Sequence, residues 1–322
     1  MQLNDKKRIL VTGAGGFIGS HLARELFSRG HYVRVVDMKW DGYLAEPYYS
    51  EKRIADLRDA HAAKQVAIDM DWIFQLAADM GGIGYITEKA ADVIYNNSLI
   101  NLNMAQAARN VNARIFYASS ACVYPNYMQE DADVKPLAES DAMPADPNEA
   151  YGWEKLFSEI VYQSFARDYG LDIRIARYHN VYGPEGTYDG GKEKAPAALC
   201  RKVALAEDGG SIEVWGDGKA TRSFCYIDDC VRGTIRLMES GYTNPINIGS
   251  DRLVSVDDLA QMAIASSGKR LQLVHDLSKP QGVRGRNADL TMVKRILQWE
   301  PDIPLERGVD WTYKWIAKQV TK

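Results

Sequence analysis

Cysteine and histidine are scarce in this sequence. Its 322 residues include five histidines and only four cysteines, Cys122, Cys200, Cys225 and Cys230. No two cysteines form a CxxC pair, and the histidines show no metal-ligand spacing. These absences argue against a disulfide scaffold and a structural zinc site, so we expect reduced thiols and no bound metal.

Long apolar runs and a strong excess of one charge are also missing. The formal net charge of −4 gives no electrostatic reason to bind nucleic acid. No apolar stretch approaches the roughly 18 residues that a bilayer span needs. We see no internal repeat or low-complexity segment. We therefore expect a cytoplasmic protein that binds neither nucleic acid nor membranes.

Glycine, in contrast, gathers near the start of the chain. An apolar run at 8–12 leads into closely spaced glycines, and a helical pattern of apolar residues follows. A strand, a tight turn and a helix in this order bring backbone N–H groups to a pyrophosphate, although a tight turn without a ligand is the alternative. The cofactor-binding residues predicted in this turn are Gly13, Gly16, Phe17, Ile18 and Gly19.

Acidic residues follow the next two predicted strands. Asp37, after the run at 32–36, can accept hydrogen bonds from an adenosine ribose and would repel a 2′-phosphate. This favours NAD over NADP, although Lys39 is close by in the sequence. Asp56 and Leu57 follow the third strand and are candidates to contact adenine, unless Asp56 is only an exposed loop residue.

The rest of the first half alternates between strand and helix patterns. Strands are predicted at 71–76, 114–119 and 172–178, and helices at 98–110 and 150–169. This alternation predicts an α/β fold, a Rossmann-type doubly wound parallel sheet, with a smaller C-terminal substrate lobe. We assign residues 1–178 to the NAD-binding domain, with return segments near 223–250, and residues 179–322 to the substrate lobe.

After Tyr178 the regular alternation ends in a glycine-rich loop at 183–191. Helices are predicted beyond it at 196–206, 228–239, 254–267 and 305–320, and strands at 211–215, 222–227 and 245–248. Because the return segments fall within this half, the two lobes interleave in sequence.

Small residues follow the strand predicted at 71–76. Leu76, Ala77 and Ala78 suit a close approach of backbone to the cofactor, although simple packing explains them equally well. Met80 and Gly81 begin a glycine-rich loop at the carboxyl end of this strand, where ligands bind in open α/β sheets. We predict that this loop contacts substrate.

Tyr151 and Lys155 are four residues apart near the start of a predicted helix, so they share a helical face. The lysine is expected to lower the pKa of the phenol from about 10 by roughly 1 to 3 units, which would make Tyr151 a base. Ser120 follows the strand predicted before this helix. It is predicted to hydrogen-bond the substrate hydroxyl oxygen from which Tyr151 removes a proton.

Together, these motifs resemble the extended short-chain dehydrogenases/reductases that act on nucleotide sugars. Within that superfamily, four segments resemble the GDP-mannose 3,5-epimerase family over nearly the whole chain. These segments are residues 77–82 (AADMGG), 117–122 (YASSAC), 191–198 (GKEKAPAA) and 282–287 (GVRGRN). The chain departs from the plant members in having no long N-terminal extension and in having Ala220 where they carry glutamine.

The resemblance implies NAD-dependent inversion of GDP-mannose at C3 and C5, giving GDP-L-galactose and the C5 product GDP-L-gulose. Tyr151 would take the C4 hydroxyl proton while hydride passes to the nicotinamide, and Lys155 would hold the ribose. The resulting C4 ketone makes the neighbouring C–H groups acidic. Cys122 would then act as base and Lys194 as acid, a division that fits ordinary pKa values of about 8.5 and 10.4.

Other residues are predicted to hold the substrate. Lys192 competes with Lys194 for the acid role, and only the resemblance favours Lys194. The diphosphate needs several fixed donors, although each candidate could instead form a surface ion pair. The predicted substrate-binding residues are Met80, Gly81, Ser120, Ala121, Cys122, Tyr151, Asn180, Glu193, Lys194, Ala195, Lys202, Arg222 and Arg286.

Two other functions remain open from the sequence. One is an NAD-dependent 4-epimerase or decarboxylase acting on another nucleotide sugar, which would need Tyr151 and Lys155 but no thiol and lysine pair. The other is a non-catalytic NAD-binding protein, against which the intact Ser120, Tyr151 and Lys155 argue. The resemblance also implies a homodimer formed through the helices near 98–110 and 150–169.

Overall fold

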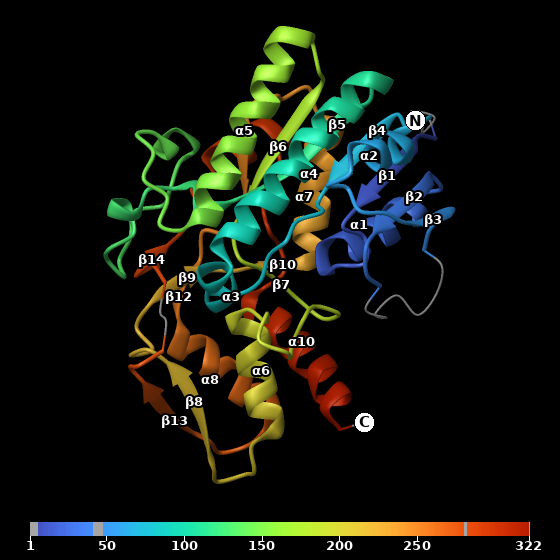
Figure 1. Ribbon diagram of the computed structural model, residues 1–322. Coiled ribbons are helices and arrows are strands. Elements are labelled where there is room, and N and C mark those ends of the chain that lie inside the picture. The colour runs from blue at the N-terminus through green and yellow to red at the C-terminus, as the bar shows by residue number, and fades with distance from the viewer. Residues whose placement is uncertain (1–5, 41–47, 280–281, 322) are drawn as a thin grey trace.

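The structure is a computed structural model that describes residues 6–40, 48–279 and 282–321. Its centre is a parallel seven-stranded sheet with the order β11-β6-β5-β4-β1-β2-β3 (Figure 1). These strands are β1 (Arg8–Thr12), β2 (Tyr32–Asp37), β3 (Glu51–Ile54), β4 (Trp72–Gln75), β5 (Arg114–Ser120), β6 (Ile173–Tyr178) and β11 (Pro245–Ile248). The strand order reverses direction between β1 and β4, as in a doubly wound fold, and the predicted fold class is confirmed.

Helices cover both faces of this sheet (Figure 1). Side chains along a strand alternate between the faces, so Leu10 packs with α2, α4 and α5, whereas Ile9 and Val11 belong to the core that includes α1 and α7. The covering helices are α1 (Phe17–Ser28), α2 (Ala60–Ala67), α4 (Ala90–Val111), α5 (Ala150–Tyr169) and α7 (Ile227–Glu239). Burial on both faces explains why β1 reads as a continuous apolar run.

A second group of elements lies below the sheet in Figure 1, where α6, α8 and α10 pack against one another. Its helices are α6 (Ala195–Leu205), α8 (Val256–Ser267) and α10 (Leu305–Val320). Its strands are β8 (Ser211–Trp215), which pairs with β13 (Gln272–Asp276), and β9 (Thr221–Ser223), which lies between β12 (Leu253–Ser255) and β14 (Gly285–Arg286). The chain returns from this group to the main sheet at β11. The predicted division at residues 178 and 179 stays a prediction.

Short elements complete the structure. They are β7 (Val181–Tyr182), which pairs with β10 (Cys225–Tyr226), helices α3 (Ile83–Glu88) and α9 (Thr291–Leu297), and 3-10 turns η1 (Ala121–Val123), η2 (Asn126–Met128) and η3 (Glu139–Ala142). In the part of the chain that the structure describes, no helix has the length and apolar character needed to cross a bilayer.

Two sequence predictions need correction. The helix predicted to begin at Ser98 begins at Ala90, because the buried Asn97 hides the apolar period while its amide exchanges hydrogen bonds with the backbone of Asp79. The single strand predicted at 222–227 is two strands, β9 and β10, which belong to different sheets.

Candidate functional site

The turn between β1 and α1 leaves no room for side chains at two of its glycines. Gly13 has a φ of +67°, and a Cβ there would lie 2.8 Å from the backbone N of Ala77. A Cβ on Gly19 would lie 2.2 Å from the carbonyl oxygen of Gly13. Gly16 caps α1 without a side chain, and Phe17 and Ile18 follow in the first turn. The turn therefore fits the predicted pyrophosphate cradle at the sheet's reversal point.

Hydrogen bonds to the Thr12 hydroxyl join this cradle to the end of β4. The hydroxyl of Thr12 accepts hydrogen bonds from the backbone N–H groups of Leu76 and Ala77, each at 3.2 Å. Ala78, the next residue, is half-buried. The small residues predicted after β4 therefore lie directly beside the glycine turn.

Asp37 lies at the other side of the turn. Its carboxylate accepts hydrogen bonds from the backbone N–H groups of Gly15 (2.9 Å) and Lys39 (3.1 Å). The carboxylate is thus fixed at the end of β2, where an adenosine ribose is expected. The side chain of Lys39 is exposed.

Asp56 and Leu57 have other partners. Arg58 forms an ion pair with Asp56 at 2.6 Å, and this contact lowers the pKa of the carboxyl group. Leu57 is buried, and its carbonyl accepts a hydrogen bond from Asn103 at 3.0 Å. The predicted adenine contact of these residues stays a prediction.

Tyr151 and Lys155 are both buried at the start of α5. Lys155 Nζ donates to the carbonyl of Ala118 at 2.9 Å and lies 5.6 Å from the centre of the Tyr151 ring. The prediction that Lys155 lowers the pKa of the Tyr151 phenol is wrong. Burial raises the pKa of Tyr151 well above its ordinary value, Cys122 and Glu154 raise it further, and only the Ser120 hydroxyl lowers it.

The end of β5 brings Cys122 beside Tyr151. The Ser120 hydroxyl accepts a hydrogen bond from the backbone N–H of Cys122 at 3.2 Å and so caps η1, in which Ala121 is buried. A Cβ on Gly152 would lie 2.2 Å from the carbonyl oxygen of Cys122. Because only glycine permits this approach, α5 packs directly on η1.

The half-buried thiol of Cys122 is surrounded by positive charge. Arg286 donates a hydrogen bond from its guanidinium to Sγ at 3.3 Å. Burial raises the pKa of the thiol, but the charge of Arg286, hydrogen bonds from Ser120 and Arg286, and the charge of Lys194 lower it more. The pKa of Cys122 is therefore below its ordinary value, which favours the thiolate.

The structure distinguishes Lys194 from Lys192. Lys194 directly precedes α6, and part of its side chain is exposed to solvent. The protein packed around its ammonium lowers the pKa of that group, and the charge of Cys122 raises it. Lys192 instead lies 3.7 Å above the centre of the Tyr85 ring and 3.9 Å from the Asp79 carboxylate. Lys194 is thus the lysine of this pair that interacts electrostatically with the thiol.

The glycine-rich loop after β4 packs against the loop that carries these lysines. Gly82 donates its N–H to the carbonyl of Lys192 at 3.2 Å, and a Cβ on Gly82 would lie 2.8 Å from the carbonyl oxygen of Glu193. Met80 and Gly81 immediately precede this contact. The Glu193 carboxylate accepts a hydrogen bond from Gly191 at 2.7 Å, and Ala195 begins α6.

Arg222 and Arg286 form a cationic pair near the thiol. Neither has a carboxylate partner within 4.0 Å among the described residues. Arg222 donates to the carbonyls of Thr221 (2.7 Å) and Val283 (2.5 Å). Burial and the charge of Arg286 lower the pKa of Arg222 to about 9. Two close guanidinium groups without an acid suit a polyvalent anion.

The other two diphosphate candidates, Asn180 and Lys202, come earlier in the chain. Asn180 donates to the carbonyl of Ser223 at 2.9 Å and so links the end of β6 to β9, next to Arg222. Lys202 donates to the carbonyl of Glu213 at 2.9 Å and forms an ion pair with its carboxylate. Their proposed contacts with phosphate stay predictions.

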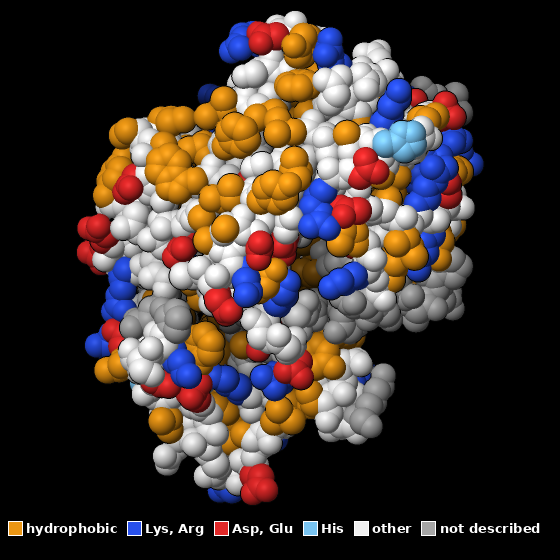
Figure 2. Space-filling view, in the orientation of Figure 1, with side chains coloured by type: hydrophobic (Ala, Val, Ile, Leu, Met, Phe, Trp, Pro, Cys, Tyr) orange, Lys and Arg blue, Asp and Glu red, His pale blue; other side chains and the backbone are white. Residues whose placement is uncertain are grey.

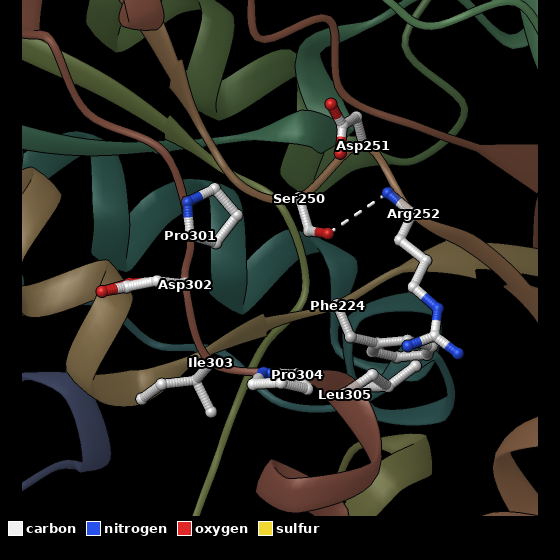
Figure 3. Close-up of a pocket in the computed structure, with 9 residues that line it drawn as sticks. All are labelled: Phe224, Ser250, Asp251, Arg252, Pro301, Asp302, Ile303, Pro304 and Leu305. Atoms are coloured by element: carbon white, nitrogen blue, oxygen red, sulfur yellow. Dashed lines mark hydrogen bonds between the residues drawn. The ribbon is translucent and has the colours of Figure 1, made fainter.

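The chain also contains a cavity of about 210 Å³ away from these groups (Figure 3). It is lined by Phe224, residues 250–252 and residues 301–305, and Figure 3 shows the Ser250 hydroxyl bonded to the backbone N–H of Arg252. None of the predicted site residues lines it.

Comparisons with known proteins agree with the geometry. Residues 9–249 match the model of the NAD dependent epimerase/dehydratase family. The chain is 46% identical to GDP-mannose 3,5-epimerase 1 of Oryza sativa subsp. japonica, over 99% of this chain and 84% of that protein. It is 45% identical to GDP-mannose 3,5-epimerase of Arabidopsis thaliana over the same shares. The resemblance found in the sequence is confirmed.

Solved structures show the same fold. UDP-glucose 4-epimerase of Thermotoga maritima superposes with a TM-score of 0.88 at 27% identity, over 97% of this chain and 99% of that one. UDP-glucuronic acid 4-epimerase of Bacillus cereus, in complex with UDP-glucuronic acid and NAD, gives 0.84 at 26% identity over the same shares. The chain therefore belongs to the NAD dependent epimerase/dehydratase family.

Proposed function

We propose that this protein is an isomerase that uses NAD to invert GDP-mannose at C3 and C5, giving GDP-L-galactose, with GDP-L-gulose as the C5 product. The observation that carries the proposal is the thiol of Cys122, which has Arg286 at 3.3 Å and interacts with Lys194 beside Tyr151. Reversible oxidation and reduction at one carbon needs only Tyr151, Lys155 and the cofactor. Inversion at the neighbouring carbons also needs a base and an acid, and Cys122 and Lys194 would serve as this pair.

The glycine cradle, Asp37 and the end of β4 would hold NAD, which supplies a reversible hydride acceptor when it is bound. Tyr151 takes the proton of the C4 hydroxyl, and Ser120 hydrogen-bonds the same oxygen. Lys155 keeps a positive charge beside this oxygen and binds the ribose. These residues together permit temporary formation of a ketone at C4 of the sugar.

Cys122 and Lys194 act on the carbons next to that ketone. The thiolate, favoured by Arg286, removes a proton from C5 or C3, and the Lys194 ammonium supplies one from the opposite face. Positive charge around the thiol also stabilises the developing enolate oxygen. Arg222 and Arg286 bind the diphosphate of the substrate.

The test is incubation of the purified holoenzyme with GDP-mannose in deuterium oxide, followed by NMR of the sugars. We expect GDP-L-galactose and GDP-L-gulose with deuterium at the inverted carbons. A product inverted only at C4, or no deuterium at C3 and C5, would overturn the proposal. UDP-glucose in place of GDP-mannose is the matched control and should remain unchanged.

We also propose that two copies associate through α4 and α5. Large apolar side chains are exposed on these helices, and Figure 2 shows a broad apolar area over this part of the molecule. Three of those on α5, Trp153, Phe157 and Ile160, lie at helical spacings of four and three residues. A stripe of this kind favours a self-complementary contact.

Sedimentation tests this assembly. We expect a dimer for the native chain and a monomer for Phe157→Asp, with Asp168→Asn on the same helix as a control that leaves the dimer intact. A native chain that sediments only as a monomer would contradict the proposal.

A further inference from the structure

Glu154 is buried without a cation partner. Three acidic side chains are almost fully buried in the described ranges, namely Glu154, Glu159 and Asp229. Glu159 pairs with Arg177 at 2.7 Å, and Asp229 pairs with Arg232. No ion pair holds Glu154 among these residues. A buried carboxylate without an ion-pair partner is costly. Since Glu154 directly precedes Lys155, we ask whether its charge acts on that lysine.

Hydrogen bonds fix one oxygen of this carboxylate. Glu154 Oε1 accepts from Asn101 Nδ2 at 2.9 Å and from the Ser158 hydroxyl at 2.8 Å, whereas Oε2 has no partner. Asn101 Oδ1 accepts in turn from Gln75, whose side-chain oxygen accepts from Thr12. The carboxylate therefore ends a buried chain of hydrogen bonds that begins at the glycine turn.

The charge of Glu154 acts on both reactive groups of α5. Lys155 is buried, and burial lowers the pKa of its ammonium. Among the charges that raise this pKa, Glu154 is the strongest. Glu154 also raises the pKa of Tyr151. The titratable groups that face this cluster are Tyr117, Cys122, Tyr151, Glu159 and Tyr162.

Glu159 is a weaker source of negative charge for Lys155 because its ion pair with Arg177 offsets that charge. Its two oxygens accept from the Arg177 guanidinium at 2.9 and 2.7 Å, and Oε1 also accepts from the Ser119 hydroxyl. Glu154 receives only neutral donors. It is thus the nearby carboxylate whose charge no cation offsets directly.

We propose that Glu154 is a positioning residue that supplies the buried counter-charge of Lys155 and sets the pH range in which Lys155 and Tyr151 work together. Their roles rest on the proposed function. The negative charge stabilises the ammonium and disfavours the tyrosinate, so it moves both titrations to higher pH. Without it, both titrations move to lower pH.

Glu154→Gln tests this directly. The amide oxygen can still accept from Asn101 and Ser158, and the NH₂ group takes the place of Oε2, which has no partner. The substitution therefore removes the charge and keeps the hydrogen bonds. In the holoenzyme turning over GDP-mannose, we expect both limbs of the pH profile to move to lower pH by about one unit.

Ser158→Ala is the matched control. It removes one hydrogen bond to the same carboxylate oxygen and keeps the charge, so we expect both limbs to stay in place. A role in packing alone would lower the rate of both variants without moving either limb. Unmoved limbs in Glu154→Gln would overturn the proposal.

A second measurement does not depend on turnover. In protein with ¹³C at the lysine ε carbons, the Lys155 NMR signal is assigned by its loss in Lys155→Arg. We expect it to titrate at lower pH in Glu154→Gln than in the native chain, and equal titration would overturn the proposal. If Glu154→Gln fails to fold, Glu154→Met, which also removes the charge, takes its place. If the protein did not act on GDP-mannose, this NMR result would be unaffected.

Discussion

The two walls of the site hold their reactive groups in different ways. On one wall, Tyr151 and Lys155 come from a single helix, and Lys155 donates to the backbone carbonyl of Ala118. On the other wall, Cys122, Lys194 and Arg286 come from η1, from the residue before α6 and from β14. The first wall is built from local sequence, whereas tertiary structure assembles the second.

This difference also affects the charges. Burial dominates the first wall, where it raises the pKa of Tyr151 and lowers the pKa of Lys155. On the second wall, neighbouring cations overcome burial and favour the charged thiolate of Cys122. The first wall suits reversible proton transfer at a hydroxyl, and the second wall suits proton removal from carbon.

The largest expected effect is on the first wall. Tyr151→Phe removes the group proposed to exchange the C4 hydroxyl proton, so every later step should be lost as well. We expect turnover of GDP-mannose to fall by about 10³-fold to 10⁴-fold, measured by NMR of the products. The variant should keep its fold, because it retains the buried aromatic ring and loses only the hydroxyl, which interacts with the Ser120 hydroxyl. Turnover within tenfold of the native rate would show that this wall is not the one that starts the reaction.

Cys122→Ala separates the walls. The variant should retain NAD, because the cradle at Gly13 and Gly19 is untouched, but deuterium incorporation at C3 and C5 should fall by about 10²-fold to 10³-fold. Released nucleotide, measured after denaturation, checks cofactor retention, and NMR checks exchange. Normal exchange in this variant would assign the base to another group.

Lys194→Gln should lower double inversion by about 10²-fold, because it removes the ammonium proposed to supply the proton. Lys192→Gln is its matched control two residues away. Lys192 lies on Tyr85 and Asp79, so its loss should change turnover by less than about threefold. Reversal of these two results would exchange the roles of the lysines.

The sequence alone predicted the glycine turn and the helix that carries the first wall. The strand, turn and helix at Gly13 to Gly19 follow local rules, and the helix predicted at 150–169 has the observed bounds. The charge environment was not predictable in this way. Spacing placed Lys155 near Tyr151 but did not show that its ammonium is directed to Ala118, so the expected lowering of the phenol pKa was wrong.

On the second wall, the roles of Cys122 and Lys194 could be assigned only through the family resemblance. Cys122 and Arg286 are 164 residues apart, and no periodic pattern connects them. Arg286 was assigned to phosphate, and its hydrogen bond to the thiol was missed. The preference for Lys194 over Lys192 likewise acquires a physical reason only when Tyr85 and Asp79 come together around Lys192. Long-range contacts of this kind leave no signal in a single sequence.

The smallest predicted effect concerns the pKa of the Cys122 thiol. Arg286→Gln removes the strongest of the charges that lower this pKa, so the thiol should titrate about one pH unit higher, with less thiolate at neutral pH. The measurement is the pH dependence of Cys122 alkylation by iodoacetamide without nucleotide sugar, followed by mass spectrometry of the labelled peptide. Omitting the sugar separates the effect on the thiol from any loss of phosphate binding. Arg286→Lys keeps the charge and should titrate closer to the native chain, whereas the same midpoint in all three proteins would show that Arg286 does not set the thiol's reactivity.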